Sequence, residues 1–433
     1  MINVKTRIYY LKLLKKWIKK NREKIYDALY LDLNKSKVEA EITEIIPIIK
    51  ELDLYIKKVS LWAKKKRVRG SLATLGTKFY SYPQPYGKVL LISPWNYPFN
   101  LSLIPFINAF GAGNSVYLKP SEFSYHSSKL LLEMANELFP KEILSVHLGD
   151  KNAAIDLLNK DLDFIFFTGN SNIGKRIYEK AAEKMIPCVL ELGGKSPTII
   201  DKNANIELAA KRIIFGKMMN GGQTCIAPDY IYVHKDVKLP LLRSLKMRYH
   251  EIYGKEPLDN DALPKIISEH HLSRIKEYGY PLEVNEKRQM SLLIKESKWT
   301  DREMQEEIFA PILPILQYDN LEKVVQEINQ HSTPLALYIF SNDKNNIDYL
   351  LTNIKSGGVA INDTILQVSN HNLGFGGIGL SGIGKYHGKA GFETFSSIRS
   401  IAKSSSFDIS LRYKYASNDT KILKIIRRLT RTN

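Results

Sequence analysis

The sequence predicts an α/β fold in which parallel sheets are covered by helices. Short apolar runs alternate with helical stretches along most of the 433 residues, and this alternation is typical of βαβ units. A chain of this length can bury more than one core, so two or more domains are expected. The 44% apolar residues and 25 glycines indicate a globular protein and exclude a disordered or fibrous one.

The predicted strands are extended apolar runs that lie between helical stretches. They cover residues 88–93, 115–119, 162–168, 188–191, 198–201, 230–234 and 336–340. An amphipathic helix opens the chain, with Leu14, Trp17, Ile18, Ile25 and Leu29 on one face. Together these elements support two α/β units.

One stretch is uncharged for long enough to suggest a membrane helix. No charged residue occurs between Val89 and Leu118. However, Pro94, Pro98 and Pro105 interrupt the stretch, and proline is disfavoured inside helices. We therefore predict a buried strand, a loop, a short helix and a second buried strand.

Cysteine content and the N-terminus indicate where the protein resides. The only cysteines are Cys188 and Cys225, too few for a disulfide framework, so a reducing compartment is expected. The N-terminus is basic and helical, without the apolar core and cleavage site of a secretory signal. These features predict a cytoplasmic protein.

The net charge of +18 has two interpretations. A basic excess suits binding to nucleic acid or an anionic membrane, but it also suits a solvated, lysine-rich surface. We favour the solvated surface and expect no nucleic-acid partner.

Near the C-terminus, Ile422, Ile425, Ile426 and Leu429 recur at helical spacing with basic residues opposite them. This amphipathic helix is predicted either to dock on its own protein or to contact a membrane peripherally.

Cys225 is the candidate nucleophile because of its surroundings. It lies in the polar, glycine-rich segment Asn220-Gly-Gly-Gln-Thr-Cys225. Structural cysteines usually lie in apolar runs, as Cys188 does, whereas a nucleophile needs access, amide donors and a group that handles protons. Upstream, Glu191 ends a strand-like run and is followed by a glycine turn. A thiol and a carboxylate so placed can form and then hydrolyse a thioester.

Further segments fall in one order almost end to end. They are Pro94-Trp-Asn96-Tyr-Pro98, Lys119-Pro-Ser-Glu122, Phe167-Thr-Gly169 through Gly174, Glu191-Leu-Gly-Gly-Lys-Ser-Pro197, Gly222-Gln-Thr-Cys225 and Glu306-Glu-Ile-Phe309. On these residues the chain resembles the aldehyde dehydrogenase superfamily. The late segments resemble its class 3-like branch, which handles medium- and long-chain aliphatic or aromatic aldehydes; they are Gly374-Phe-Gly-Gly-Ile-Gly379, Tyr386-His-Gly388 and Phe392-Glu-Thr-Phe395.

The resemblance implies two related open parallel-sheet domains and a small third element. The Rossmann-like NAD(P)-binding domain would cover residues 1–65 and 85–192, and the catalytic domain residues 193–368. Residues 66–84 and 369–433 would supply a bridging sheet, which joins the subunits of a homodimer, and the C-terminal tail.

The resemblance also implies the reaction, which is oxidation of an aldehyde to its carboxylic acid. Cys225 would attack the aldehyde to give a thiohemiacetal and then a thioester. The side-chain amide of Asn96 and the backbone N–H of Cys225 would stabilise the oxyanion. Glu191 would then activate the water that releases the acid.

The expected cofactor is NAD, with NADP as an alternative. By resemblance, Lys119 and Glu122 would contact the adenosine ribose. Gly169, Ser171 and Gly174 would form the dinucleotide turn, where a helix start favours phosphate, although their spacing is not the usual G-x-G-x-x-G. The residues around Lys119 also suit a plain helix start capped by Ser121.

The nicotinamide side of the site carries one departure from the family's pattern. Glu307 would hold the nicotinamide ribose and Phe309 would pack near the ring. Ala310 stands where glycine is usual, which would cost energy if that position requires a positive φ. Ser171 replaces a threonine but keeps the hydroxyl, and Leu380 replaces a polar residue near the expected substrate entrance.

Two alternatives to aldehyde oxidation remain at this point. A related enzyme could release the thioester to coenzyme A or work reductively, but Glu191 is suited to activating water. A catalytically silent scaffold could bind membrane or nucleic acid through basic patches, but Cys225, Glu191 and Asn96 are all present. No metal is expected, because the cysteines and the nine histidines show no ligand spacing.

Overall fold

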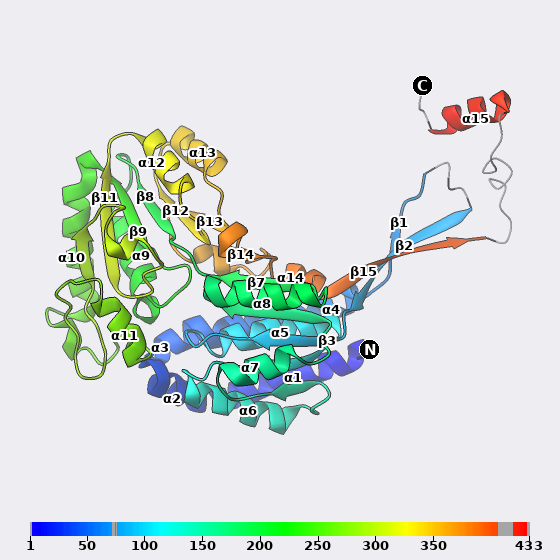
Figure 1. The fold of residues 1–433 in the computed structure, drawn as a ribbon, viewed down its shortest axis with the longest axis horizontal. Helices are drawn as coiled ribbons and strands as arrows, with labels where there is room; N and C mark the ends of the chain where they lie inside the picture. Colours follow the sequence, from blue (N-terminus) through cyan, green and yellow to red (C-terminus); the bar gives the residue numbers. More distant parts are fainter. Residues whose placement is uncertain (1, 72–73, 75, 406–418, 431–433) are drawn as a thin grey trace.

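The structure is a computed structural model that describes residues 2–71, 74, 76–405 and 419–430, and it contains three sheets (Figure 1). The first sheet has the strand order β14-β7-β6-β3-β4-β5. Its strands are β3 (Lys88–Ile92), β4 (Ser115–Lys119), β5 (Leu144–Val146), β6 (Phe164–Gly169), β7 (Cys188–Leu192) and β14 (Gly382–Ile383). All neighbours are parallel except β14, which is antiparallel to β7.

Helices cover both faces of this sheet because its strands are apolar on both sides. Along β3, Val89 and Leu91 belong to one core, whereas Leu90 and Ile92 belong to the other, as the twofold alternation of a strand requires. The helices of this half are α1 (Val4–Lys20), α2 (Arg22–Leu33), α3 (Lys37–Ala40), α4 (Ile46–Trp62), α5 (Asn100–Ala112), α6 (Tyr125–Leu138), α7 (Lys151–Leu158), α8 (Ser171–Glu183) and α14 (Gly388–Thr394). A π-helical turn, η1 (Glu41–Ile45), joins α3 to α4.

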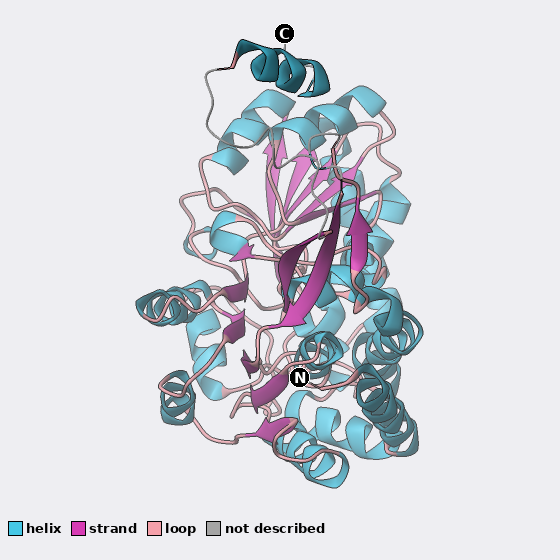
Figure 2. Cartoon of the chain, turned by 90° about the vertical axis from the view of Figure 1, so that its right-hand side faces the viewer, coloured by secondary structure: helices cyan, strands magenta, loops and turns pink. Residues whose placement is uncertain are grey.

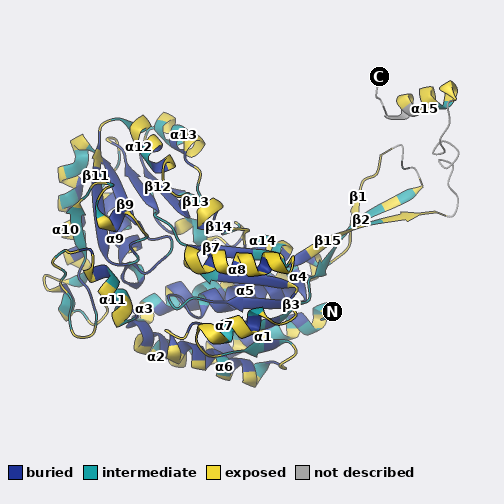
Figure 3. Cartoon of the chain, viewed as in Figure 1, coloured by how far each residue is buried: buried dark blue, intermediate teal, exposed yellow. Residues whose placement is uncertain are grey.

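The second sheet is fully parallel, with the order β10-β11-β9-β8-β12-β13. Its strands are β8 (Pro197–Ile200), β9 (Tyr230–His234), β10 (Leu293–Glu296), β11 (Ile312–Tyr318), β12 (Ala336–Phe340) and β13 (Gly358–Ile361). Its helices are α9 (Ile206–Met218), α10 (Lys238–Tyr253), α11 (Glu269–Lys276), α12 (Leu321–Asn329) and α13 (Lys344–Asn353). Figure 3 shows the two sheets as the buried layers, with exposed residues on the outer helix faces.

Short helical turns occupy several of the connections. They are η3 (Met219–Gly222), η4 (Lys235–Val237), η5 (Pro257–Asp259), η6 (Arg302–Met304), η7 (Leu366–Ser369) and η8 (Gly379–Ser381). The chain passes from the first sheet to the second directly after β7, so β7 and β8 are consecutive in sequence but belong to different sheets. The domain limits given above remain predictions.

The third sheet is antiparallel and projects from the body of the molecule (Figures 1 and 2). It has the order β1-β2-β15, with β1 (Lys66–Val68), β2 (Thr77–Pro85) and β15 (Ser396–Ser404). Beyond it lies α15 (Thr420–Thr430). Leu423 and Ile425 of α15 are exposed and Ile422 is half-buried; the side chains of Ile426 and Leu429 lie outside the described residues.

The predicted α/β class with parallel sheets is confirmed. Each of the seven apolar runs forms a strand, and the uncharged stretch from Val89 to Leu118 forms β3, a loop, α5 and most of β4. No helix in the described part of the chain is long and apolar enough to cross a membrane. The prediction of a single opening helix is wrong, because the helical stretch divides at Asn21 into α1 and α2.

Candidate active site

The predicted site residues of the first half lie at one edge of the first sheet. Asn96 follows β3, Lys119 ends β4, Gly169 ends β6 and Glu191 is the penultimate residue of β7. Because these four strands are parallel neighbours, their carboxyl ends meet at the same edge, where open α/β sheets bind ligands. The chain crosses to the second sheet at this same edge.

Cys225 enters the site from a left-handed turn. Asn220, Gly221 and Gly222 have successive φ values of 52°, 61° and 77°, and the loop after them carries Cys225 ahead of β9. Gly222 must be glycine for a second reason, since a Cβ there would lie 2.5 Å from the carbonyl oxygen of Ala310. The turn is therefore packed directly against Ala310, the residue after Phe309.

The Cys225 thiol is surrounded by groups that control its protonation. Burial raises the pKa of the Cys225 thiol, and the carboxyl groups of Glu307 and Glu191 raise it further. The backbone N–H groups of Cys225 and Ile226 donate to the sulfur and work in the opposite direction. The thiol is thus protonated at neutral pH and needs a base to become a nucleophile.

Glu191 has the properties of such a base. Its side chain is 3% exposed, and neither carboxyl oxygen has a hydrogen-bond partner among the described residues. Burial raises the pKa of Glu191 well above its ordinary value, and Lys385 offsets part of this effect. A carboxylate that is desolvated and unpaired accepts a proton readily once it is ionised.

Asn96 is fixed by its side chain and by its main chain. The side-chain Nδ2 donates to the carbonyl of Gln223 at 3.0 Å. The backbone carbonyl of Asn96 accepts from Asn220 Nδ2 at 2.9 Å and from Lys35 Nζ at 2.8 Å. An amide NH₂ has two hydrogens, so one remains for another acceptor.

The predicted adenosine-side residues, Lys119 and Glu122, both lie at the carboxyl end of β4. Lys119 is buried, and its Nζ pairs with Glu122 at 2.7 Å. The alternative helix start at Ser121 is wrong, because α6 begins at Tyr125 after Ser124. Ser121 instead accepts a hydrogen bond from the backbone of Phe123 at 3.3 Å.

The predicted phosphate turn begins a helix, as expected for its sequence. Asn170 caps α8 by accepting from the backbone N–H of Ile173 at 2.9 Å. Gly174 is buried in the first turns of α8, where a Cβ would lie 2.5 Å from Leu192. The Ser171 hydroxyl makes a 3.5 Å contact with the carbonyl of Leu380. Leu380 therefore lies beside the cofactor turn.

These residues fit a dinucleotide on structural grounds. A helix N-terminus at the carboxyl edge of parallel strands attracts phosphate. Lys119 and Glu122 supply a donor and an acceptor at the end of β4, which is separated from β6 by β3. At the other end, Glu307 Oε1 is buried without a hydrogen-bond partner among the described residues, so it can accept from a hydroxyl group.

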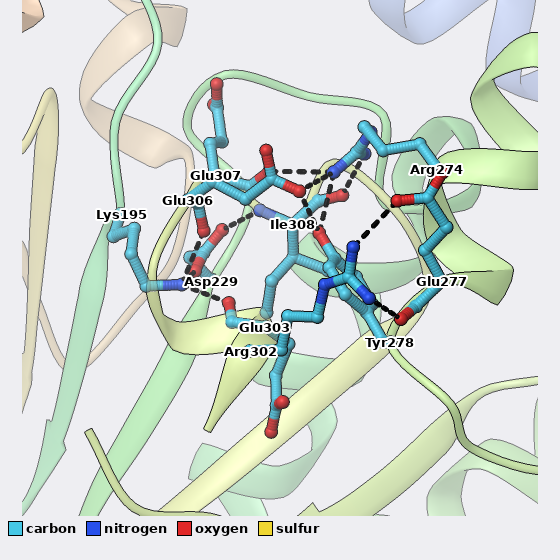
Figure 4. Close-up of polar contacts among 10 residues, drawn as sticks. All are labelled: Lys195, Asp229, Arg274, Glu277, Tyr278, Arg302, Glu303, Glu306, Glu307 and Ile308. Atoms are coloured by element: carbon cyan, nitrogen blue, oxygen red, sulfur yellow. Dashed lines mark hydrogen bonds and ion pairs between the residues drawn. The ribbon is translucent and has the colours of Figure 1, made fainter. Parts of the chain in front are cut away.

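The segment that carries Glu307 is held by a network of charged side chains (Figure 4). Lys195 pairs with Asp229 at 2.5 Å and donates to the carbonyl of Glu306 at 2.9 Å. The other oxygen of Asp229 accepts from the backbone N–H of Ile308 at 3.0 Å. From the far side, Arg274 donates to the carbonyl of Ile308 at 2.6 Å. The segment is thus fixed from both sides.

This network is connected with strained backbone at Phe309. Phe309 has a φ of 51°, which is uncommon for a bulky residue. Ala310 is absent from the positive-φ residues and is fully buried. The concern about alanine at that position is therefore resolved: the left-handed residue is Phe309, and Ala310 adopts an ordinary conformation.

Aromatic side chains surround the thiol and the predicted nicotinamide region. Tyr97, Tyr338 and Tyr386 are fully or almost fully buried, and in each the pKa is raised, first by burial and partly by Cys225. Trp95 packs edge-on against Phe309 with ring centroids 5.5 Å apart. The site is therefore mostly apolar apart from its carboxyl groups.

Several residues of the site carried no functional signal in the sequence. Lys195 and Asp229 lie inside the segments of Glu191 and Cys225, and their position there was the only available indication. Arg274, Lys35 and Lys217 lay outside every motif. Lys217 is 1% exposed and burial lowers its pKa to about 8. In the described part of the chain, no group of histidine, cysteine, aspartate and glutamate side chains could hold a metal ion.

Comparisons with known proteins find aldehyde dehydrogenases. The model of the aldehyde dehydrogenase family matches residues 1–401. The 4,4'-diaponeurosporen-aldehyde dehydrogenase of Staphylococcus aureus is 40% identical over 395 residues, covering 89% of this chain and 86% of that protein. A dimeric NADP-preferring aldehyde dehydrogenase of Canis lupus familiaris is 36% identical over 427 residues, covering 96% and 94%.

A solved structure is similar over almost the whole chain. It is the substrate-bound state of Staphylococcus aureus AldH, with a TM-score of 0.96 and 37% sequence identity. The match covers 99% of this chain and 95% of that one.

Proposed function

Because the chain belongs to the aldehyde dehydrogenase family, an oxidoreductase family that uses NAD or NADP, we propose that it oxidises an apolar aldehyde to the carboxylic acid through a Cys225 thioester. This proposal rests mainly on the proximity of a half-buried thiol to the carboxyl groups of Glu191 and Glu307. Glu191 and Glu307 both raise the pKa of Cys225, and the Glu191 carboxyl group has no hydrogen-bond partner in the described structure.

In the first step, the Cys225 thiol loses its proton to Glu191, and the sulfur attacks the aldehyde carbon. The free hydrogen of the Asn96 amide and the backbone N–H of Cys225 stabilise the oxyanion. Loss of one such donor typically lowers the rate by about a hundred- to a thousandfold.

In the second stage, the tetrahedral centre on Cys225 collapses to the thioester. When bound, the nicotinamide supplies the hydride acceptor for this oxidation. Glu191 releases the proton it took from the thiol to solvent. It then takes a proton from water, and the resulting hydroxide attacks the thioester carbon. The acid leaves, and the proton returns to the sulfur.

The cofactor contacts follow from the arrangement of the strand ends. Lys119 and Glu122 would bind the adenosine ribose, and the α8 turn at Gly169, Ser171 and Gly174 would bind the pyrophosphate. Glu307 would accept from the nicotinamide ribose while Phe309 packs near the ring. The Glu122 carboxylate favours a free ribose hydroxyl and therefore NAD, although relatives include NADP-preferring enzymes.

The substrate class is a medium- or long-chain aliphatic or an aromatic aldehyde. Three tyrosines lie close to the thiol. Beside Glu191, Gly376 packs so closely that a Cβ would lie 2.9 Å from Glu191 Oε1. The segment around Gly376 exposes Leu373 and Ile378, which suits an apolar substrate.

Assembly and location complete the proposal. The three-stranded sheet leaves β1 exposed along its length, so a homodimer would form there, and a relative is described as dimeric. Cys188 and Cys225 are both free, in agreement with the cytoplasm. Exposed apolar and basic residues of α15 suit peripheral membrane contact.

The decisive experiment is turnover with a matched mutant. The purified protein is incubated with decanal or benzaldehyde and NAD or NADP, and absorbance of the reduced cofactor is followed. We expect turnover that disappears in Cys225→Ala and persists in Cys188→Ala. Absence of turnover by the wild-type protein, or unchanged turnover in Cys225→Ala, would disprove the mechanism.

A further inference from the structure

Lys35 is a charged residue buried beneath the loop that carries Asn96. It is 1% exposed and lies just after α2, far from Asn96 in sequence. Its Nζ donates to Glu44 Oε1 and to the backbone carbonyl of Asn96, both at 2.8 Å. The ammonium also lies 3.9 Å from the ring centroid of Tyr97. Two hydrogen bonds and a cation–π contact satisfy its three hydrogens.

Glu44 extends this contact to the other end of the same loop. It is fully buried, and its Oε2 accepts from the backbone N–H of Asn100 at 2.8 Å. Lys35 and Glu44 thus hold the loop at Asn96 and at the first residue of α5. Glu44 lies in the π-helical turn η1, and such turns occur frequently at functional sites.

The same N-terminal segment also holds the turn before Cys225. Glu39 Oε1 accepts from the backbone N–H of Asn220 at 2.5 Å. Asn220 in turn donates to the carbonyl of Asn96. The main chain of Asn96 is therefore fixed by two donors, and its side chain by the carbonyl of Gln223. Only one amide hydrogen of Asn96 is left to point at a substrate.

A buried ion pair is a poor means of stabilising a fold. Desolvation of the two charges offsets most of their attraction, and apolar side chains of similar volume often stabilise a core as well. The Lys35–Glu44 pair nevertheless occupies completely buried positions and contacts the main chain at Asn96 and at Asn100. Its geometry therefore indicates a role in orientation.

We infer that Lys35 and Glu44 are positioning residues, which hold the Asn96 amide in the direction required to stabilise the oxyanion. The inference rests on the proposed function, in which Asn96 is that donor. Lys35 does not touch the reacting atoms. It acts through Asn96, so its effect must vanish when the Asn96 amide is absent.

A double-mutant cycle tests this dependence. Wild type, Lys35→Met, Asn96→Ala and the double variant are compared in single-turnover hydride transfer, with each rate expressed per titrated active site. Lys35→Met is expected to lower the rate about ten- to a hundredfold, less than loss of the donor itself. The KM for the cofactor should change less than about twofold, since Asn96 does not bind it.

Comparison of the Lys35 substitution in the wild-type protein and in Asn96→Ala distinguishes positioning from general destabilisation. In Asn96→Ala, the Lys35 substitution should lower the remaining rate less than about twofold. Equal losses in both backgrounds, a loss that appears in cofactor KM, or no loss at all would overturn the inference. Lys37→Met is the matched control, because Lys37 is an exposed lysine on the same segment paired with exposed Glu23.

A second variant, Glu44→Gln, tests the inference even if Lys35→Met does not fold. Glu44→Gln keeps the side-chain volume and one acceptor oxygen, so it should lower the rate by several-fold and only when Asn96 is present. An equal loss without Asn96 would again overturn the inference. Wild-type turnover in the same assay distinguishes failure of the proposed function from failure of this inference. If the wild-type protein shows no turnover, the proposed function is refuted. If it turns over and the losses of the two substitutions are additive, only the role of Lys35 and Glu44 is refuted.

Discussion

The carboxyl group of Glu307 lies directly against Gly193. A Cβ added to Gly193 would come within 1.9 Å of Glu307 Oε2, whereas at Gly194 the nearest atom would be 3.5 Å away. Neither glycine has a positive φ. Close approach of the Glu307 side chain, not backbone conformation, therefore explains glycine at residue 193.

This contact predicts different effects for two adjacent substitutions. Gly193→Ala should displace Glu307 and lower kcat/KM for the cofactor about ten- to a hundredfold. Gly194→Ala should change it less than about twofold, because the added methyl group meets only ordinary contacts. Initial rates at varied cofactor concentration measure both. Equal effects would show that Glu307 is not placed by Gly193.

Replacement of Glu191 should separate the two halves of the reaction. In Glu191→Gln at alkaline pH, hydroxide from solution can still remove the thiol proton so that the thioester forms, but no carboxylate activates water. Steady-state turnover should fall by about a hundred- to ten-thousandfold, while reduced cofactor still forms in a burst close to one equivalent per site. Stopped-flow absorbance shows the burst. A variant that turns over at the wild-type rate would exclude Glu191 as the base.

The Lys195–Asp229 pair should be important for stability as well as for the cofactor. In Asp229→Ala, the largely buried ammonium of Lys195 loses its ionic partner and the Ile308 N–H loses its acceptor. The cost should be about 3 kcal/mol of unfolding free energy, together with a higher cofactor KM. Thermal unfolding and initial rates measure the two effects. Arg302→Ala is the control, since its pair with Glu277 is exposed and should contribute less than about 1 kcal/mol.

Glu307 should make stability depend on pH. Burial, with a smaller effect from Asp229, raises the pKa of Glu307 to about 8. Because the folded protein holds this proton more tightly than the unfolded chain, stability falls as pH rises from the ordinary carboxyl pKa toward about 8. Glu307→Gln removes this dependence. The Tm of the variant should therefore rise relative to the wild-type Tm as pH increases across that range, and the difference between the two Tm values should stay constant at higher pH. Calorimetry at stepped pH checks the result; parallel curves throughout would contradict it.

Ala310 should tolerate the glycine that is usual at this position. Since Phe309 carries the positive φ, Ala310→Gly relieves no strain and only adds freedom to the unfolded chain. It should leave cofactor KM within about twofold and cost about 1 kcal/mol of stability. A marked gain in cofactor affinity would show that alanine distorts the site.

Local sequence patterns predicted the strands, because apolar runs of four to seven residues mark buried parallel strands whatever their partners are. They also placed Cys225, Glu191 and Asn96 in segments that the fold brings to one edge. The pairing of Lys35 with the Asn96 loop could not be predicted in this way, because it joins residues that are distant in sequence and share no periodicity. The sequence pattern did not predict the division of the opening helix at Asn21, because the apolar face continues from Ile18 to Ile25.

Other features were missed because they are too short or too unusual. Strand β14 has only two residues, so no alternation can mark it. The positive φ at Phe309 contradicts the preference of a bulky side chain, and only the surrounding hydrogen bonds impose it. Such positions depend on tertiary contacts that local propensity does not record.

The antiparallel pairing of Gly382 with Glu191 has a consequence for synthesis of the protein. A ribosome translates Glu191 and Cys225 long before it reaches Gly376 and β14. Until then, the edge of β7 beside Glu191 lacks its partner strand, and the burial that raises the pKa of the Glu191 carboxyl group is incomplete. In the proposed mechanism, the nascent chain therefore carries Cys225 before its base is fully buried. The site is complete only when about the last seventh of the chain has been translated, after all the other strands of both larger sheets.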